Sequence, residues 1–199
     1  MFILGLTGSL AMGKSATAQM FVDEGVPLHD ADAVVHSLYD GEATAEIEAA
    51  FPGTTADGKV DRARLGERVI GDTAAIKRLE QIVHPKVTAA SAKFLADAER
   101  AGAPVAVLDV PLLFETGGDK RCDAVAVVSA PADIQRKRAF ERPGMTDDKF
   151  LAIIGKQMPD EEKRRRADFV VDTSRGFDHA RAQVRDILKR VRTMPKRRP

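Results

Sequence analysis

The residues best suited to chemistry form a glycine-rich run near the N-terminus. Residues 8–15 read Gly-Ser-Leu-Ala-Met-Gly-Lys-Ser, which matches the phosphate-binding pattern G-x-x-x-x-G-K-[ST] at every specified position. Phosphate oxygens need several backbone N–H donors that point inward, and glycine leaves room for that approach. We therefore expect Gly8 and Gly13 to shape the loop. Lys14 should act catalytically by reaching the β- and γ-phosphates of ATP, and the Ser15 hydroxyl should bind Mg²⁺.

Other phosphate-loop proteins fit the sequence less well. GTPases usually carry Asn-Lys-x-Asp, but this chain contains no asparagine and no D-x-x-G switch motif. Motors and nucleic-acid ATPases need a longer core than 199 residues and usually further domains. The short chain and its N-terminal phosphate loop indicate a small-molecule kinase.

Two carboxylates could place the acceptor hydroxyl. Asp30 and Asp32 follow a short apolar run and precede a helical pattern. Either one could orient the hydroxyl and take its proton, while the other caps the helix. Alternate residues of an extended chain point the same way, so spacing alone does not separate the two roles. We favour Asp30 as the cap because it comes first.

These residues must be positioned by a sheet whose strands read as continuous apolar runs. Continuous runs separated by helical patterns are typical of a parallel sheet built from βαβ units. Ligands of such sheets bind at the carboxyl ends of the strands. The predicted strands are Phe2–Leu6, Val26–Leu28, Val105–Val110, Ala124–Val128 and Phe169–Val171.

Two stretches break this alternation. Residues 33–102 contain no convincing strand and predict a helical insertion, interrupted by a loop at Phe51–Lys59. Gln135–Arg166 contains ten lysines and arginines around a Pro143-Gly144 turn and predicts a basic helical hairpin that serves as a lid. The predicted nucleotide-binding core is then residues 1–32, 103–134 and 167–199. Its basic tail, Lys189–Pro199, is expected to be a frayed helix end.

Composition limits the partners. The net charge is only +1, which does not favour nucleic acid as a partner. No run approaches the ~18 apolar residues of a membrane span. Cys122 is the one cysteine, so no intramolecular disulfide can form, which fits a reducing cytoplasm. We expect a cytoplasmic protein that is a monomer or a weak homo-oligomer.

An ordered set of motifs resembles the dephospho-CoA kinase family from Met1 to about Leu188. The set extends the phosphate loop by residues in the family's order: Gly5-Leu-Thr-Gly8, Asp30-Ala-Asp32, His84-Pro85, Asp109-Val-Pro-Leu-Leu-Phe-Glu115, Gln135-x-x-Arg138 with Arg142, Gln157, and Ala167-Asp168-Phe-Val-Val-Asp172. The resemblance implies an α/β fold: a P-loop NTPase core with a five-stranded parallel sheet flanked by helices, a helical CoA-binding insertion and a helical lid. It also implies ATP and dephospho-CoA as substrates.

The resemblance assigns further roles. It implies that Asp32 is the catalytic base and that Arg138 and Arg142 clasp the phosphates of ATP. Asp109 ends a strand of four apolar residues, the pattern of a carboxylate that holds Mg²⁺ through water. His84 precedes a proline, so we expect it to shape a helix end or the wall of the substrate site.

The phosphate loop departs from the usual family sequence, Gly-Gly-Ile-Gly-Ser-Gly-Lys-Ser-Thr. Ser9, Ala11, Met12 and Ala16 stand where the family has Gly, Gly, Ser and Thr. We still expect Ala11, Met12 and Ala16 to line the ATP site. Ala11 matters most, because a Cβ at a position that needs positive φ strains the loop.

Two alternatives stay open. The chain could phosphorylate another small hydroxyl compound, such as a nucleotide or a sugar acid. It could also be a nucleotide-binding regulator that uses its basic hairpin and tail for nucleic acid. A regulator would hydrolyse ATP slowly, with no dependence on an acceptor.

Overall fold

The computed structural model describes residues 1–197 and divides the chain into two compact units. The larger unit combines residues 1–29 with the chain from residue 98 onward, and the smaller unit is Asp30–Asp97. Residues 198 and 199 of the predicted core and tail lie outside the described residues.

The larger unit is a parallel sheet with helices on it. In chain order it contains β1 (Phe2–Gly8), α1 (Lys14–Asp23), most of β2 (Leu28–Asp30), β5 (Val105–Asp109), the 3₁₀ helix η1 (Gly118–Arg121), β6 (Ala124–Ser129), α6 (Ala132–Phe140), α7 (Asp147–Ile154), α8 (Asp160–Arg166), β7 (Phe169–Asp172) and α9 (Phe177–Val191). The strand order is β2-β5-β1-β6-β7, and β1 lies between β5 and β6 with Leu4 opposite both Val107 and Ala124. The predicted five-stranded parallel sheet is confirmed.

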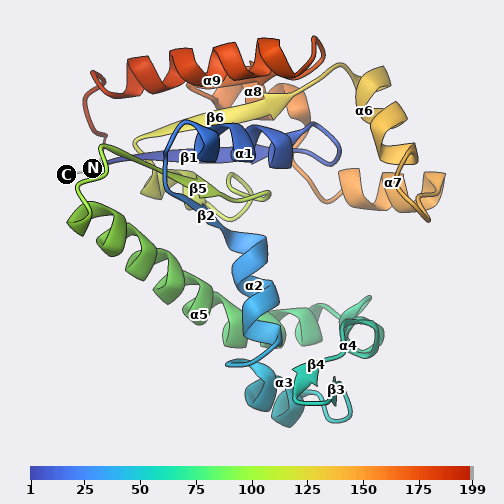
Figure 1. Cartoon of the computed structure of the whole chain (residues 1–199). Coiled ribbons are helices and arrows are strands. Elements are labelled where there is room, and N and C mark those ends of the chain that lie inside the picture. Colours follow the sequence, from blue (N-terminus) through green and yellow to red (C-terminus); the bar gives the residue numbers. More distant parts are fainter. Residues whose placement is uncertain (198–199) are drawn as a thin grey trace. The chain divides into compact units, whose positions relative to one another are not determined.

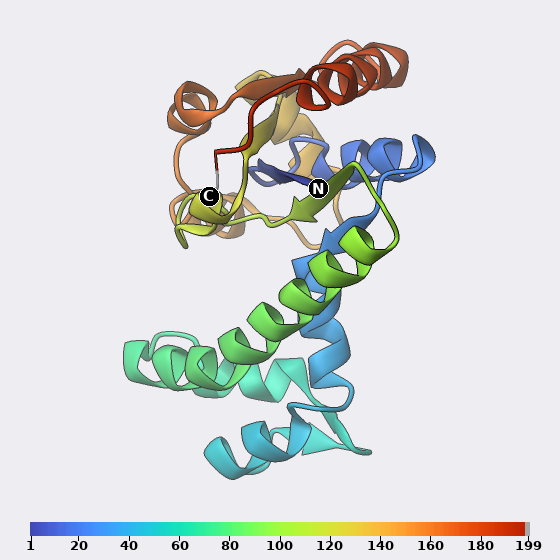
Figure 2. The same cartoon turned by 90° about the vertical axis from the view of Figure 1, so that its left-hand side faces the viewer.

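Burial on both faces explains why the strands read as unbroken apolar runs. Every residue of β1, β5 and β6 is buried. Alternate residues such as Leu4 and Leu6 pack against Phe21 of α1 and Val184 of α9, while Gly5, on the opposite face, lies against Leu113. In the view of Figure 2, α9 runs above the strands of the sheet. The main hydrophobic core thus fixes the sheet edge from which the phosphate loop leaves.

The second strand begins two residues later than predicted, at Leu28 and not at Val26. The amide of Val26 is used to close α1, because it donates to the Phe21 carbonyl at 3.1 Å. Pro27 has no N–H to donate, although its carbonyl accepts from Val107 N at 2.9 Å. The helix end and the proline therefore delay regular pairing.

The smaller unit is mainly helical, with α2 (Ala31–Tyr39), α3 (Thr44–Ala50), β3 (Thr55–Ala56), β4 (Lys59–Val60), α4 (Arg62–Val69) and most of α5 (Thr73–Arg100). It has its own apolar cluster around Ile47 and Leu65. The prediction that this region lacks strands was wrong, because β3 and β4 form a small antiparallel hairpin. Its turn is Asp57-Gly58, both with positive φ, which is a strong hairpin signal.

Two further predictions need correction. Gln135–Arg166 is not a two-helix hairpin, because a third helix, α8, begins after Pro159. The tail is also more ordered than a frayed helix end, because Met194 packs against the main core and Arg197 pairs with Asp168, both beyond the end of α9.

In Figure 1, α6 and α7 lie beyond the end of the sheet toward which β1 points.

Candidate nucleotide-binding site

The phosphate loop joins β1 to α1, as the sequence predicts, and both of its motif glycines are required by their surroundings. A Cβ on Gly8 would lie 2.7 Å from the Val128 carbonyl oxygen. Gly13 has φ of +94°, and a Cβ there would lie 3.2 Å from the Thr173 side chain. The close packing of β6 and of the segment after β7 therefore fixes where the loop starts and where it enters α1.

Lys14 and Asp109 form an ion pair at this edge of the sheet. The Lys14 Nζ lies 2.6 Å from Asp109 Oδ1, and the two side chains are 14% and 2% exposed. The pair forms here because Asp109 ends β5 opposite Leu6 of the neighbouring β1, close to the start of the loop. Both charged groups are largely shielded from solvent. At a phosphate loop such a pair can separate, so that the ammonium binds phosphate and the carboxylate binds a cation.

The oxygen groups of this edge fit Mg²⁺. Ser15 is exposed in the first turn of α1, and Asp109 provides a carboxylate. Within residues 1–197 no cluster of three His, Cys, Asp or Glu side chains could hold a metal ion. Mg²⁺ is commonly held in kinases by one or two protein oxygens together with phosphate and water, so this donor set suits it.

Arg138 lies beside the loop. Its Nη1 donates to Thr173 Oγ1 at 2.9 Å and its Nη2 donates to the Thr173 carbonyl at 2.8 Å. Thr173 Oγ1 in turn donates to the Met12 carbonyl at 2.8 Å. Arg142 lies in the exposed turn after α6, where its amide donates to the Ala139 carbonyl. The structure therefore links Arg138 to the loop through Thr173 and leaves Arg142 on the surface.

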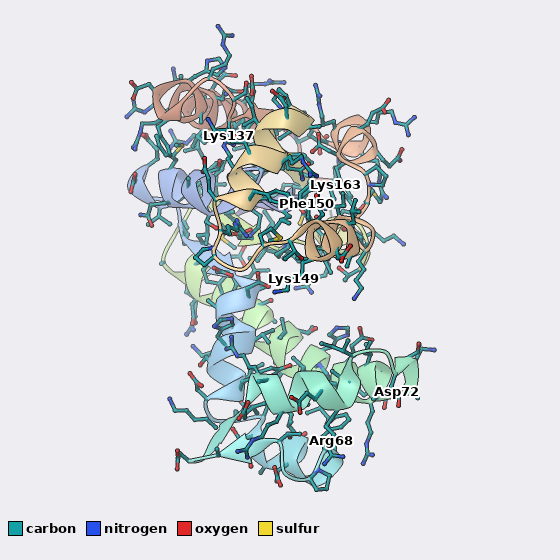
Figure 3. The ribbon with its side chains drawn as sticks, turned by 90° about the vertical axis from the view of Figure 1, so that its right-hand side faces the viewer. Arg68, Asp72, Lys137, Lys149, Phe150 and Lys163 are labelled. Atoms are coloured by element: carbon teal, nitrogen blue, oxygen red, sulfur yellow. The ribbon has the colours of Figure 1, made fainter. Side chains whose placement is uncertain are left out.

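Helices α6 and α7 pack on the loop through a small apolar cluster. Ala11 is buried with Ala139 of α6 and Phe150 of α7, and Leu10 packs against the same cluster. Figure 3 shows Phe150 between these helices. The same helices carry exposed cations, among them Lys137 and Lys149. Helices α6 and α7 therefore provide both the apolar residues that pack on the loop and exposed positive charges.

Ala11 has φ of +61°, as expected from its replacement of a glycine. A left-handed conformation costs a residue with a Cβ about 1–2 kcal/mol. Met12 is 2% exposed, and its sulfur accepts the Ala130 N–H at 3.2 Å. Ala16 is half-buried in α1. Packing therefore holds Ala11 and Met12 in place. Ala11 lacks the backbone freedom of the usual glycine, and Met12 lacks the hydroxyl of the usual serine.

Sequence reasoning missed Lys163, which fixes α8 to the sheet edge. Its side chain is fully buried, and Nζ lies 3.0 Å from Glu115 Oε1 and 3.2 Å from the Pro111 carbonyl, which also accepts from Thr7 Oγ1. Burial acts to raise the pKa of Glu115, but the Met158 N–H and the Lys163 ammonium together hold that pKa below its ordinary value. The run Lys163–Arg166 looks like a solvated charge cluster, so composition gave no sign of a buried member.

The smaller unit carries the two aspartates, and the structure separates them. Asp30 is the N-cap of α2: its Oδ1 accepts from Asp32 N at 2.9 Å and from Ala33 N at 3.1 Å. The predicted capping role of Asp30 is confirmed. Asp32 is exposed in the first turn of α2, so its carboxylate remains accessible to a substrate.

His84 lies within α5, so the first of its two expected roles, shaping a helix end, was wrong. Proline costs a helix one hydrogen bond and a clash one turn back, but the 28 residues of α5 absorb that cost. His84 is exposed in an open groove of about 840 Å³ along one face of the helix. The groove is lined by Lys77, Glu80, Gln81, His84, Pro85, Thr88, Ala89 and Ala92.

Among the described residues, no helix combines the length and the apolar character needed to cross a membrane.

Comparison with known proteins gives one consistent result. The family model described as "Dephospho-CoA kinase" matches residues 2–179. Proteins named dephospho-CoA kinase from Rhodopseudomonas palustris strain HaA2 and from Bradyrhizobium diazoefficiens are 62% and 63% identical to this chain, over 100% of both chains in each pair. The matches therefore extend over the complete length of these relatives.

Solved structures agree on the fold. A Thermus thermophilus crystal structure matches with a TM-score of 0.85 and 32% identity, covering 95% of this chain and 96% of that one. Dephospho-CoA kinase from Campylobacter jejuni matches with a TM-score of 0.67 and 24% identity, over 95% and 96% of the two chains. At that identity the second likeness supports the fold alone.

Proposed function

This chain belongs to the dephospho-CoA kinase family, and from that premise we propose that it transfers the γ-phosphate of ATP to the ribose 3′-hydroxyl of dephospho-CoA. The products are CoA and ADP, so the reaction is the last step of coenzyme A biosynthesis. The observation that carries the proposal is the Lys14–Asp109 pair at a complete phosphate loop. The pair supplies the two charges that phosphoryl transfer from ATP needs at this place.

Binding of ATP separates this pair. The phosphates lie over residues 8–15, where the N–H groups of the loop and the N-terminus of α1 attract them. Lys14 turns from Asp109 to the β- and γ-phosphate oxygens and stabilises the charge that spreads over them in a loose transition state. Arg138, already linked to the loop through Thr173, and Arg142 add positive charge around the same phosphates.

The Ser15 hydroxyl and the Asp109 carboxylate would hold Mg²⁺ at this edge of the sheet. The ion would supply positive charge that offsets the negative charge of the phosphates. Once Lys14 turns to the phosphates, the Asp109 carboxylate is released from the ion pair and would be available to the cation. The buried position of Asp109 keeps its carboxylate in one place for that exchange.

Asp32 positions the 3′-hydroxyl for in-line attack and accepts its proton. Support comes from the smaller unit, where Asp30 is committed to the cap of α2 and Asp32 is exposed beside it. His84 contributes to the wall that binds dephospho-CoA, since it lines the groove along α5.

The predicted lid, residues 135–166, contains a part that moves and a part that does not. We expect α6 and α7 to close further over bound ATP, and α8 to stay on the sheet because Lys163, Glu115 and Met158 tie it there. An ATP analogue should therefore slow amide hydrogen exchange in residues 132–156 and leave α8 nearly unchanged. Equal exchange of α6 and α7 with and without the analogue would argue against a lid.

The proposed function also has consequences for the partners and the location of the enzyme. Its partners are the two small-molecule substrates, with no nucleic acid and no membrane. The net charge of +1 does not favour nucleic acid. It works in the cytoplasm as a monomer or a weak homo-oligomer.

ADP release with and without dephospho-CoA tests the proposed function. Release should depend strongly on dephospho-CoA, and nucleotides or sugar acids should not replace it at equal concentration. Faster ADP release with a nucleotide or a sugar acid would show that the protein is a kinase for that other small molecule. Slow release that ignores every acceptor would indicate a regulator.

A further inference from the structure

Leu10, at the tip of the phosphate loop, is held by two glutamine side chains. Its N–H donates to Gln157 Oε1 at 3.0 Å, and its carbonyl accepts from Gln135 Nε2 at 2.9 Å. Gln135 is in α6 and Gln157 follows α7, so the bonds come from both ends of the α6–α7 segment. The chemistry forces the orientation of both amides, because a backbone N–H needs an acceptor and a carbonyl needs a donor.

The loop at this point is a tight turn of the type II kind. The Met12 N–H donates to the Ser9 carbonyl at 3.2 Å, and of the two central residues only Ala11 has positive φ. Type II turns favour glycine at this third position, whereas alanine there favours the type I alternative. The two turns differ by a flip of the central peptide, here the peptide between Leu10 and Ala11.

That flip would reverse what the loop presents to a phosphate. In a trans peptide the carbonyl and the following N–H point in opposite directions. While the Leu10 carbonyl is directed at Gln135, the Ala11 N–H points the other way. A flipped peptide would turn the carbonyl oxygen to the side that now carries the N–H, and an oxygen repels an anion that an N–H attracts.

We propose that Gln135 and Gln157 are positioning residues that hold the Leu10–Ala11 peptide in the orientation ATP requires, and that they offset the preference of Ala11 for the flipped turn. Gln135 has the larger part, because it binds the carbonyl that moves in the flip. Gln157 fixes the preceding N–H and so anchors the turn. Packing of Ala11 against Ala139 and Phe150 assists them.

The proposal rests on the proposed function only in requiring that the loop binds ATP. Equilibrium binding of a non-hydrolysable ATP analogue, without acceptor, therefore tests it. Gln135→Glu removes the donor to Leu10, while Gln157→Glu keeps an acceptor for the Leu10 N–H. Each adds one negative charge next to the same residue, so the second variant controls for charge in the first.

We expect Gln135→Glu to weaken binding of the analogue roughly tenfold more than Gln157→Glu does. The uncharged variant Gln135→Leu should also weaken binding, by roughly tenfold. In an Ala11→Gly background, Gln135→Leu should cost less than about threefold, since glycine accepts positive φ without help. Melting temperatures of all variants show which are folded.

Equal losses from Gln135→Leu with and without Ala11→Gly would overturn the proposal, because the glutamine would then act independently of the turn. Equal losses from the two glutamate variants would do the same. If Gln135→Glu fails to fold, the Gln135→Leu comparison decides alone. A wild-type protein that does not bind the analogue would contradict the proposed function and, with it, this inference.

Discussion

Lys14→Ala should lower phosphoryl transfer to dephospho-CoA by roughly 10³-fold or more while the protein stays folded. In the mechanism that we propose, the substitution removes a charge that acts on the transferring phosphoryl group in the transition state. Loss of one such group costs enzymes about 10²–10³-fold. Lys14 also forms an ion pair with Asp109, so its loss leaves that buried carboxylate without the lysine. Single-turnover rates at saturating substrates measure the effect.

The control for this variant is Lys93→Ala. Lys93 is an exposed lysine of α5 that pairs with Asp97, away from the phosphate loop in sequence. It should retain wild-type turnover, and both variants should give the circular dichroism of the wild type. A folded Lys14→Ala protein with nearly normal turnover would show that the loop has no catalytic role.

Asp32→Asn is expected to lower the single-turnover rate by about 10²–10⁴-fold, with little change in the binding of either substrate. The asparagine keeps the size of the side chain and loses the ability to take a proton. The loss falls toward the lower end of this range if the loose transition state requires little proton transfer. Comparing the rate with the dissociation constant of dephospho-CoA separates chemistry from binding.

The neighbouring aspartate provides the control. Asp30→Asn should keep both rate and stability, because asparagine caps a helix as well as aspartate does. Asp30→Ala should lower the free energy of unfolding by about 1 kcal/mol, since it leaves the amides of Asp32 and Ala33 without their acceptor. If Asp32→Asn kept its rate and Asp30→Asn lost it, the two roles would be reversed. If both kept it, the acceptor would bind elsewhere.

The parallel sheet and the phosphate loop could be predicted because their sequence signals are local. The strands are continuous apolar runs, and the loop is a contiguous motif between a strand and a helix. Positive φ at Ala11 was also predictable from the family resemblance, because the residue stands where the family's loop has a glycine. Asp30 could be predicted as the cap from its place at the junction of strand and helix.

The contacts between distant segments could not be predicted. The burial of Lys163 depends on Glu115 and Pro111, about fifty residues earlier, and the three residues that follow it in the sequence are arginines that face solvent. The two glutamines on Leu10 are likewise separated from the loop by more than 120 residues. Periodicity does not report such pairings, since each partner alone looks like an ordinary surface residue.

Two predictions about the smaller unit were wrong for reasons that lie in the local sequence. His84-Pro85 was expected to shape a helix end or the wall of the substrate site. The helix end was wrong, because the remaining hydrogen bonds of α5 outweigh the one that proline removes. The β3–β4 hairpin was missed because its strands are two residues long, too short for any alternating pattern. Its Asp57-Gly58 turn was the available signal.

The most direct test of the central claim is to follow the γ-phosphate itself. ATP labelled in its γ-phosphate is mixed with the protein, Mg²⁺ and dephospho-CoA, and the products are separated and identified by mass spectrometry and phosphorus NMR. The label should appear in CoA, as a monoester on the ribose 3′-oxygen, in an amount equal to the ADP formed. Label recovered only as inorganic phosphate, at the same rate with and without dephospho-CoA, would contradict the account.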